Sequence, residues 1–189
     1  LKSIVKKESY HCEGDFFFYG LGSIKEFVKE AKKEKALVIV GFSFCQKPLE
    51  CPASRFSDKC IADPDHAVCR QCDIGKVLHA LPEKKAIPLL IPTVHYIGEK
   101  IFEMMEKHRD RELIFMITAC EMSLRMFGDF GNMMALKGIG VRLGGRICNT
   151  MRAFELAEEG TKPGLTLVLP DTQSEILALM REIRNSISN

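Results

Sequence analysis

Residues 36–45 read ALVIVGFSFC, a continuous apolar run that ends in a cysteine. A run of this length, rich in β-branched residues, is typical of a strand that is buried on both faces of a parallel sheet. The segment before it begins at Ser23, a good N-cap, and places its apolar residues at helical spacing before a lysine-rich end. The two segments together predict a helix followed by a buried strand.

The same alternation continues along the chain. We expect further strands at residues 86–91, 112–118, 138–143 and 165–169, and helices at residues 73–81, 94–108, 120 onward, 149–159 and 172–187. Thr172 and Glu175 have the spacing of a capping box for the last helix. Alternating strands and helices predict an α/β fold with an open, mainly parallel sheet and helices on both faces, as in Rossmann-like domains.

The bulk composition fits one domain, and we expect residues 1–189 to form it, with residues 1–22 as an N-terminal arm held by its aromatic side chains. The chain is 46% hydrophobic and has 27 basic against 25 acidic residues. Because the charges are balanced, a nucleic-acid partner is not expected. No stretch has the apolar length of a membrane helix. The cysteine usage, with no leader-like segment, favours a reducing, cytoplasmic setting.

The segment from Cys45 to Cys72 reads CQKPLECPASRFSDKCIADPDHAVCRQC and holds five of the eight cysteines. It has neither helical nor strand periodicity. Ordering its backbone costs about 1–2 kcal/mol per residue, which so few apolar side chains cannot offset. We therefore expect a metal centre to order residues 45–72.

The strongest local pattern is Cys69-x-x-Cys72, ahead of a predicted helix, where two sulfurs face one ion and the helix N-terminus favours thiolate. The predicted centre is an iron-sulfur cluster or zinc, because both accept four thiolates. Two alternatives stay open: a structural zinc in a binding or scaffold protein, and a thiol oxidoreductase that uses the CxxC pair. The predicted ligands are Cys45, Cys51, Cys69 and Cys72, with Cys60 and His66 in reserve.

Other reactive residues follow the predicted strands. Ligands of open α/β sheets bind beyond the carboxyl ends of the strands. Four residues in such positions are candidates to line a crevice there, with His95 as a proton shuttle and Arg146 as an anion contact: His95, Cys120, Arg146 and Cys148. The expected partner is a small molecule or a redox protein, and the centre would pass electrons to it or polarise it.

These motifs together resemble the cysteine-rich domain-of-unknown-function family numbered one hundred and sixteen, from bacteria and archaea. The resemblance covers roughly residues 37–155 and is carried by Cys45 after a strand, Cys51-Pro52, Cys69 and Cys72 followed by Ile74-Gly75, Ala119-Cys120-Glu121, and Cys148 with Thr150. The family tends to show a CxxCxxC run, and here His66 stands in its first place. The resemblance implies the α/β architecture and a metal site at Cys45, Cys51, Cys69 and Cys72, and it implies no substrate.

Overall fold

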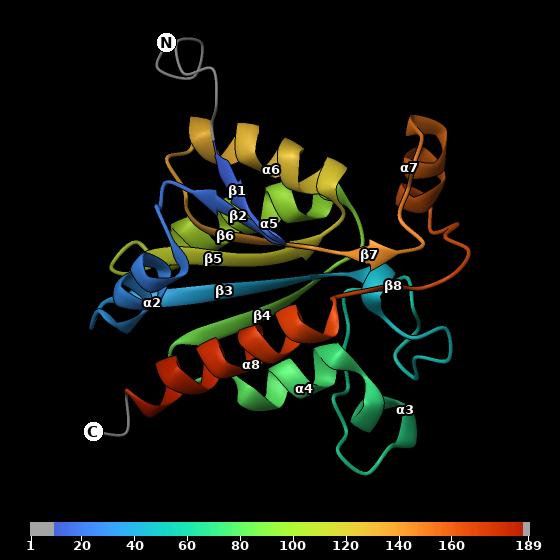
Figure 1. Ribbon diagram of the computed structural model, residues 1–189, viewed down its shortest axis with the longest axis horizontal. Helices are drawn as coiled ribbons and strands as arrows, with labels where there is room; N and C mark the ends of the chain where they lie inside the picture. The colour runs from blue at the N-terminus through green and yellow to red at the C-terminus, as the bar shows by residue number, and fades with distance from the viewer. Residues whose placement is uncertain (1–9, 187–189) are drawn as a thin grey trace.

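The computed structural model describes residues 10–186 and shows an α/β fold around a six-stranded mixed sheet (Figure 1). The strand order is β1-β2-β6-β5-β3-β4, so strands distant in sequence are neighbours. The strands are β1 (His11–Glu13), β2 (Phe16–Tyr19), β3 (Ala36–Ser43), β4 (Ala86–Ile91), β5 (Glu112–Ala119) and β6 (Lys137–Arg142). The predicted mainly parallel sheet is confirmed for β3 to β6.

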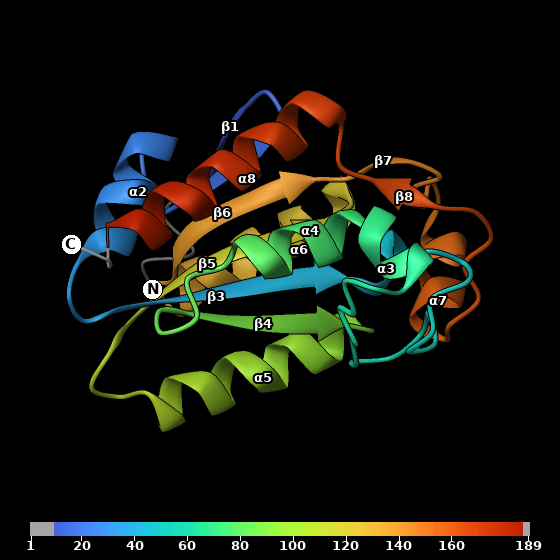
Figure 2. The same ribbon diagram turned by 90° about the horizontal axis from the view of Figure 1, so that it is seen from below.

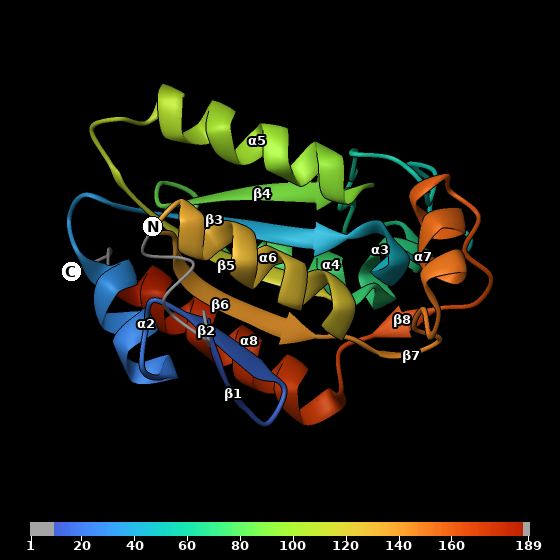
Figure 3. The ribbon, with the colours of Figure 1, turned by 90° about the horizontal axis from the view of Figure 1, so that it is seen from above.

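Helices cover both faces of the sheet. They are α2 (Ile24–Lys32), α3 (Ala67–Gln71), α4 (Asp73–Ala80), α5 (Val94–Lys107), α6 (Glu121–Met133), α7 (Met151–Glu158) and α8 (Pro170–Asn185). Figure 2 shows α4 and α8 across one face, and Figure 3 shows α5 and α6 over the other. The helix α7 lies beyond the carboxyl ends of the strands rather than on a face.

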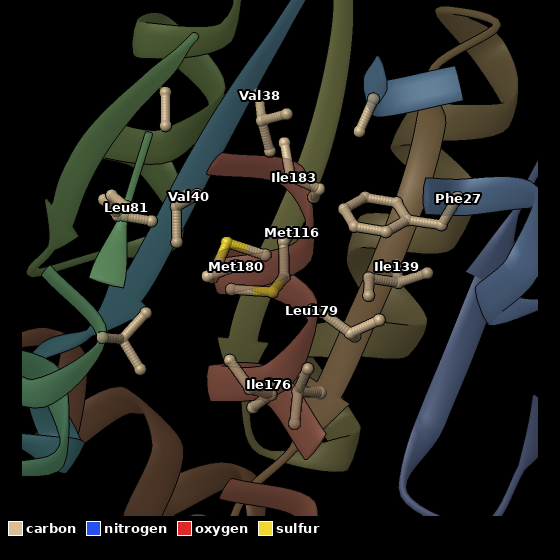
Figure 4. Packing of buried hydrophobic residues seen from close by; sticks show 14 of the residues in the cluster. Phe27, Val38, Val40, Leu81, Met116, Ile139, Ile176, Leu179, Met180 and Ile183 are labelled. Atoms are coloured by element: carbon tan, nitrogen blue, oxygen red, sulfur yellow. The ribbon is translucent and has the colours of Figure 1, made fainter. Parts of the chain in front are cut away.

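The central strand β3 explains why its sequence is a continuous apolar run. Val38 and Val40 belong to the core beneath α2, α4 and α8, whereas Leu37 and Ile39 belong to the core beneath α5 and α6. All four side chains are almost fully buried. Figure 4 shows the first of these cores, where side chains of β3 and α8 interdigitate. Because both faces are covered, the buried residues of β3 from Ala36 to Phe42 are all non-polar.

The order of the parallel strands creates a switch point between β3 and β5. The chain runs from β3 to its neighbour β4 on one side and then returns to β5 on the other side of β3. The connections that leave the carboxyl ends of β3 and β5 therefore diverge, and the space between them is where open α/β sheets bind ligands. Cys45 and Cys120 follow these two strands directly.

The part of the segment 1–22 that the structure describes contributes strands to the sheet and is not only an arm held by aromatic side chains. Its residues from Tyr10 form the hairpin β1–β2, and β2 pairs antiparallel with β6, so the sheet is mixed. Asp15, in the turn of this hairpin, accepts hydrogen bonds from the Arg142 guanidinium (Nη2 at 2.7 Å) and from Thr172 Oγ1 (2.8 Å). The rest of the predicted arm, residues 1–9, lies outside the described residues.

Two predictions near the C-terminal end are corrected. The expected strand at residues 165–169 is only β8 (Thr166–Leu167), which pairs with β7 (Gly144–Gly145) as a separate two-stranded sheet. The predicted capping box fails because the helix begins earlier, at Pro170, which puts Thr172 inside the first turn. Its hydroxyl donates to Asp15 instead of capping the helix.

The cap predicted at Ser23 is present, since Ser23 Oγ accepts a hydrogen bond from the Glu26 N–H at 3.2 Å. Further along α2, Glu30 is buried and its carboxylate lies 2.8 Å from Lys33 Nζ and 3.2 Å from Lys137 Nζ. The hydrogen bond from Lys33 lowers the pKa of Glu30, and Lys137 adds to this shift. This ion-pair network ties α2 to the start of β6.

Candidate functional site

Seven cysteines line two separate cavities. We call Cys51, Cys60, Cys69 and Cys72 the loop thiols, because all four line one small cavity under the connection from β3 to α4. We call Cys45, Cys120 and Cys148 the cavity thiols, because all three line a larger cavity between α5, α6 and α7. The short 3-10 helix η1 (Phe44–Gln46) lies between the groups, with Cys45 on one side and Lys47 on the other.

The loop thiols surround a cavity of about 20 Å³ on the α4 side of the sheet. Cys69 is buried and the other three are half-buried. Cys60 and Cys72 pack against the core that α4 and α8 share with the sheet. The small cavity is therefore anchored to rigid elements on one side and formed by the irregular loop on the other.

Lys47 organises this loop. Its side chain is only 1% exposed, and its ammonium donates to Ser57 Oγ and Lys59 O, both at 2.9 Å, and to Ser54 O. Burial lowers the pKa of Lys47, while the nearby thiols, Cys51 first, oppose that shift. The buried ammonium of Lys47 thus holds residues 47–59 together in the absence of helices and strands there, and it lies beside the loop thiols.

The CxxC pair is placed by two consecutive short helices. Cys69 belongs to α3, and Cys72 ends α3 and immediately precedes α4. A Cβ atom at Gly75 would lie 2.6 Å from the Cys69 carbonyl oxygen, so the bend between the helices requires glycine there. No side chain caps α4 by a hydrogen bond, yet the Gly75 and Ile74 N–H groups are close enough to the Cys72 sulfur to favour its thiolate.

Burial dominates the acidity of two loop thiols. It raises the pKa of Cys72 and of Cys60, although the Gly75 N–H at Cys72 and the Ala62 N–H at Cys60 oppose the change. Without a bound cation both side chains therefore stay protonated at neutral pH. A divalent ion would reverse the balance, since a coordinating thiol loses its proton.

The predicted metal ligands are only partly brought together. Cys51, Cys69 and Cys72 line the small cavity with the reserve residue Cys60, whereas Cys45 lines the other cavity. The reserve residue His66 is an exposed N-cap of α3, whose Nδ1 accepts from the Val68 N–H at 3.3 Å. As the side chains stand, no three His, Cys, Asp or Glu residues within 10–186 are arranged to hold a metal ion. Coordination by the loop thiols would need their side chains to rotate inward.

The larger cavity, of about 300 Å³, lies at the switch point of the sheet, since residues that follow both β3 and β5 line it. Its walls are mainly apolar and come from the carboxyl ends of β3, β4 and β5 and from α5, α6 and α7, including Ile97, Ile101, Phe127 and Phe154. Its polar groups are few and come from several elements, including Thr118 of β5, Glu158 of α7 and Thr166 of β8. This is the size and composition of a site for a small molecule.

Each cavity thiol has a different environment. Burial raises the pKa of Cys45, which is half-buried behind η1. Cys120 Sγ lies 3.3 Å from Ser123 Oγ. Cys148 Sγ accepts a hydrogen bond from Lys162 Nζ at 3.1 Å, and this cation has no carboxylate partner among the described residues. The charge of Lys162 also opposes the effect of burial on Cys45, but Cys148 is the one of the three cavity thiols that is hydrogen-bonded to this cation.

Arg55 links the loop that carries the loop thiols to the segments that line the larger cavity with the cavity thiols. Its guanidinium donates to Lys47 O at 3.1 Å, to Cys45 O at 3.0 Å, and to the carbonyls of Lys162 and Gly164. One side chain from the cysteine-rich loop thus fixes the end of β3 against the segment that carries Lys162. The shape of the larger cavity depends on this loop as well as on the sheet.

The two other predicted site residues lie at the margin. The His95 side chain is 85% exposed and its Nε2 lies 3.2 Å from Glu99 Oε1, so it contributes only to the rim of the larger cavity. Arg146 is exposed and does not line that cavity, and its backbone N–H donates to Leu165 O in the β7–β8 pair. Neither position supports the predicted roles of proton shuttle and anion contact.

Sequence reasoning missed Lys47, Arg55 and Lys162. No periodicity or motif marks them, because each acts through contacts with residues distant in the chain or through loop carbonyls. The one sequence feature that pointed to Lys47 was its position two residues after Cys45, within the segment that was already expected to need stabilising contacts.

Comparison of the chain with protein-family models, with curated proteins and with solved structures gives no significant match. The resemblance to the family numbered one hundred and sixteen therefore stays a prediction. Within residues 10–186, none of the helices combines the length and apolar character that crossing a membrane requires. The case for function consequently depends on the two thiol groups and their surroundings.

Proposed function

We propose that the chain binds a metal centre through the loop thiols Cys51, Cys60, Cys69 and Cys72. The observation that carries the proposal is that all four line one cavity, although 21 positions separate the first from the last in the sequence. Four thiolates are the ligand set of structural zinc and of iron-sulfur clusters. Cys60 takes the place expected for Cys45, which belongs to the other cavity.

The surroundings of the loop thiols suit a negatively charged tetrathiolate. The ammonium of Lys47 would offset part of its charge, and the N–H groups at Cys72 and Cys60 would orient and stabilise the thiolates. The cavity volume of about 20 Å³ is close to that of a single ion or water, which favours zinc over a larger group. A cluster would require the loop to move outward.

Zinc bound by four thiolates would hold the loop in place, and a cluster would supply electron transfer. The loop in turn shapes the larger cavity through Arg55. We also infer that the parallel strands form a doubly wound, Rossmann-like core with the cysteine-rich loop over its carboxyl edge, because the switch point between β3 and β5 opens toward both thiol groups. A cytoplasmic setting and a small-molecule or redox partner remain part of this proposal.

The test is anaerobic purification followed by metal and sulfide analysis of matched cysteine variants. Cys60→Ser should lose most of the bound metal, whereas Cys45→Ser, which replaces another half-buried thiol, should retain it. Replacing the native metal with cobalt should give the intense charge-transfer absorption of a tetrathiolate. Equal metal content in both variants would contradict the assignment of Cys60.

The same preparation separates the competing functions. One equivalent of colourless zinc supports a structural site, and iron with acid-labile sulfide supports a cluster. A protein with no stoichiometric metal and a reversible Cys69–Cys72 disulfide would overturn the metal proposal in favour of thiol redox chemistry.

A further inference from the structure

The larger cavity holds a group of polar side chains that the metal proposal does not use. Cys148 and Lys162 form a thiol–ammonium pair, and both line the cavity. An ammonium at hydrogen-bond distance from a thiol is an arrangement that activates cysteine as a nucleophile. The thiol and the ammonium line the larger cavity with its apolar walls, and neither lines the small cavity of the loop thiols.

A second, independent observation also points to a ligand. Thr166 lines the same cavity and is 2% exposed, yet its hydroxyl has no hydrogen-bond partner among residues 10–186. Leaving a buried hydroxyl unpaired costs about 1–3 kcal/mol, so such a group is usually satisfied by a ligand or water. Thr166 pairs with Gly145, three residues before Cys148, so the unpaired donor and the thiol belong to neighbouring backbone segments.

We propose that Cys148 is a nucleophile that accepts a short acyl group from a thioester bound in the larger cavity. The roughly 300 Å³ of the cavity corresponds to about ten water molecules, which limits the acyl chain to a few carbons. Ile97, Ile101 and Phe127 would contact the chain. The Thr166 hydroxyl would donate to the acyl carbonyl oxygen.

The proposed step balances without a further reactant. The Cys148 thiol first gives its proton to water. The resulting thiolate attacks the carbonyl carbon, a new carbon–sulfur bond forms, and the carbon–sulfur bond to the carrier thiol breaks. The departing thiolate takes a proton from the Lys162 ammonium, which regains one from water. Bonds of the same kind are formed and broken, so the acyl-enzyme retains the energy of the thioester for a later acceptor.

The neighbouring thiols are poorer candidates for this role. Burial raises the pKa of Cys45, which keeps it in the unreactive thiol form. Cys120 has a neutral hydroxyl partner, Ser123, instead of a cation. The reaction is therefore expected at one cysteine of the three.

The test uses the full chain with its metal as purified and two reagents of different shape. The first is 4-nitrophenyl hexanoate, which carries an acyl chain, and the second is iodoacetamide, which is small and needs only a reactive thiolate. We expect a burst of one equivalent of 4-nitrophenolate, with the hexanoyl group found on Cys148 by peptide mass spectrometry. Acylation mapped mainly to another cysteine would overturn the proposal.

Three substitutions separate the roles of charge, space and hydrogen bonding. Lys162→Met should slow both reagents about tenfold or more at Cys148, and Lys162→Arg should restore most of the rate. Gly98→Leu adds a side chain where a Cβ meets nothing within 4 Å, so it should fill the cavity and slow only the hexanoyl ester. Thr166→Val should also slow only the ester, about tenfold.

Circular dichroism and the midpoint of urea unfolding establish that each variant is folded. The proposal fails if folded Lys162→Met reacts with iodoacetamide at the wild-type rate, because the ammonium would then have no effect on the thiol. It also fails if Gly98→Leu leaves hexanoyl transfer unchanged, because the cavity would then not hold the chain. Because no variant alters a loop thiol, loss of the metal proposal would leave this test intact.

Discussion

Replacing Lys47 with methionine should open the cysteine-rich loop without unfolding the protein. Methionine keeps the buried stem but removes the ammonium that donates to Ser57 Oγ, Lys59 O and Ser54 O. Hydrogen bonds to a charged group contribute about 1.5–3 kcal/mol each. Their full sum of about 4.5–9 kcal/mol is an upper bound, because the loop carbonyls regain water on opening and the ammonium no longer has to be desolvated.

We therefore expect a net local loss of about 2–3 kcal/mol, which is a 30- to 150-fold rise in the population of the open loop. Native-state digestion with trypsin measures this population, because Arg55 and Lys59 are cleavable positions inside the loop. Cleavage there should accelerate by about the same factor. The free energy of global unfolding in urea should fall by about the same 2–3 kcal/mol, because the closed native state loses these bonds relative to both the open and the unfolded states.

A matched control is Lys29→Met, which removes an exposed lysine from α2. Its loop should be cut at the wild-type rate. If Lys47→Met and Lys29→Met are cleaved at rates within about twofold of each other, the buried ammonium does not hold the loop, and the argument for an internally tied thiol loop is wrong.

Three further predictions concern the fold around the sites. Gly75→Ala should lower the free energy of unfolding by about 1–3 kcal/mol in urea titrations and reduce metal content, because its Cβ would collide with the Cys69 carbonyl; wild-type values of both would refute the need for glycine. Because the pKa of Glu30 is lowered in the folded protein, its carboxylate stabilises the fold above its ordinary pKa of 4.5. This stabilisation is lost as the pH falls through the pKa of Glu30 in the folded protein. Glu30→Gln should therefore lose less unfolding free energy than the wild type on acidification from about pH 7 to about pH 3, and parallel curves would contradict this. Asp15→Asn should lower the unfolding free energy by about 1–2 kcal/mol and increase hydrogen exchange in β1 and β2, because the guanidinium of Arg142 loses the nearer of its two carboxylates and keeps only Glu121 at 3.8 Å; unchanged exchange would show that strand pairing alone holds the hairpin.

The sequence by itself determined the parallel core. The run at 36–45, the later apolar strands and the amphipathic segments between them carry the periodicities of buried strands and covering helices, and these depend on near neighbours in the chain. The strand predicted at 86–91 has the same limits as β4, and the helix predicted at 94–108 differs from α5 by one residue. Strand direction also places Cys45 and Cys120 within two residues of the carboxyl ends of β3 and β5, as their positions in the sequence predicted.

Only the tertiary structure decided how the thiols are divided. Cys45 and Cys51 are six positions apart, yet η1 turns them toward different cavities, and the sheet separates the cores behind those cavities. Lys162 lies in a loop without sequence periodicity, yet its ammonium is hydrogen-bonded to Cys148. The Thr172 hydroxyl donates to Asp15 instead of forming the expected capping box. Contacts of this kind join residues that are far apart in the chain, so no local sequence pattern predicts them. Their energies come from burial and from charges that approach one another only when the sheet assembles.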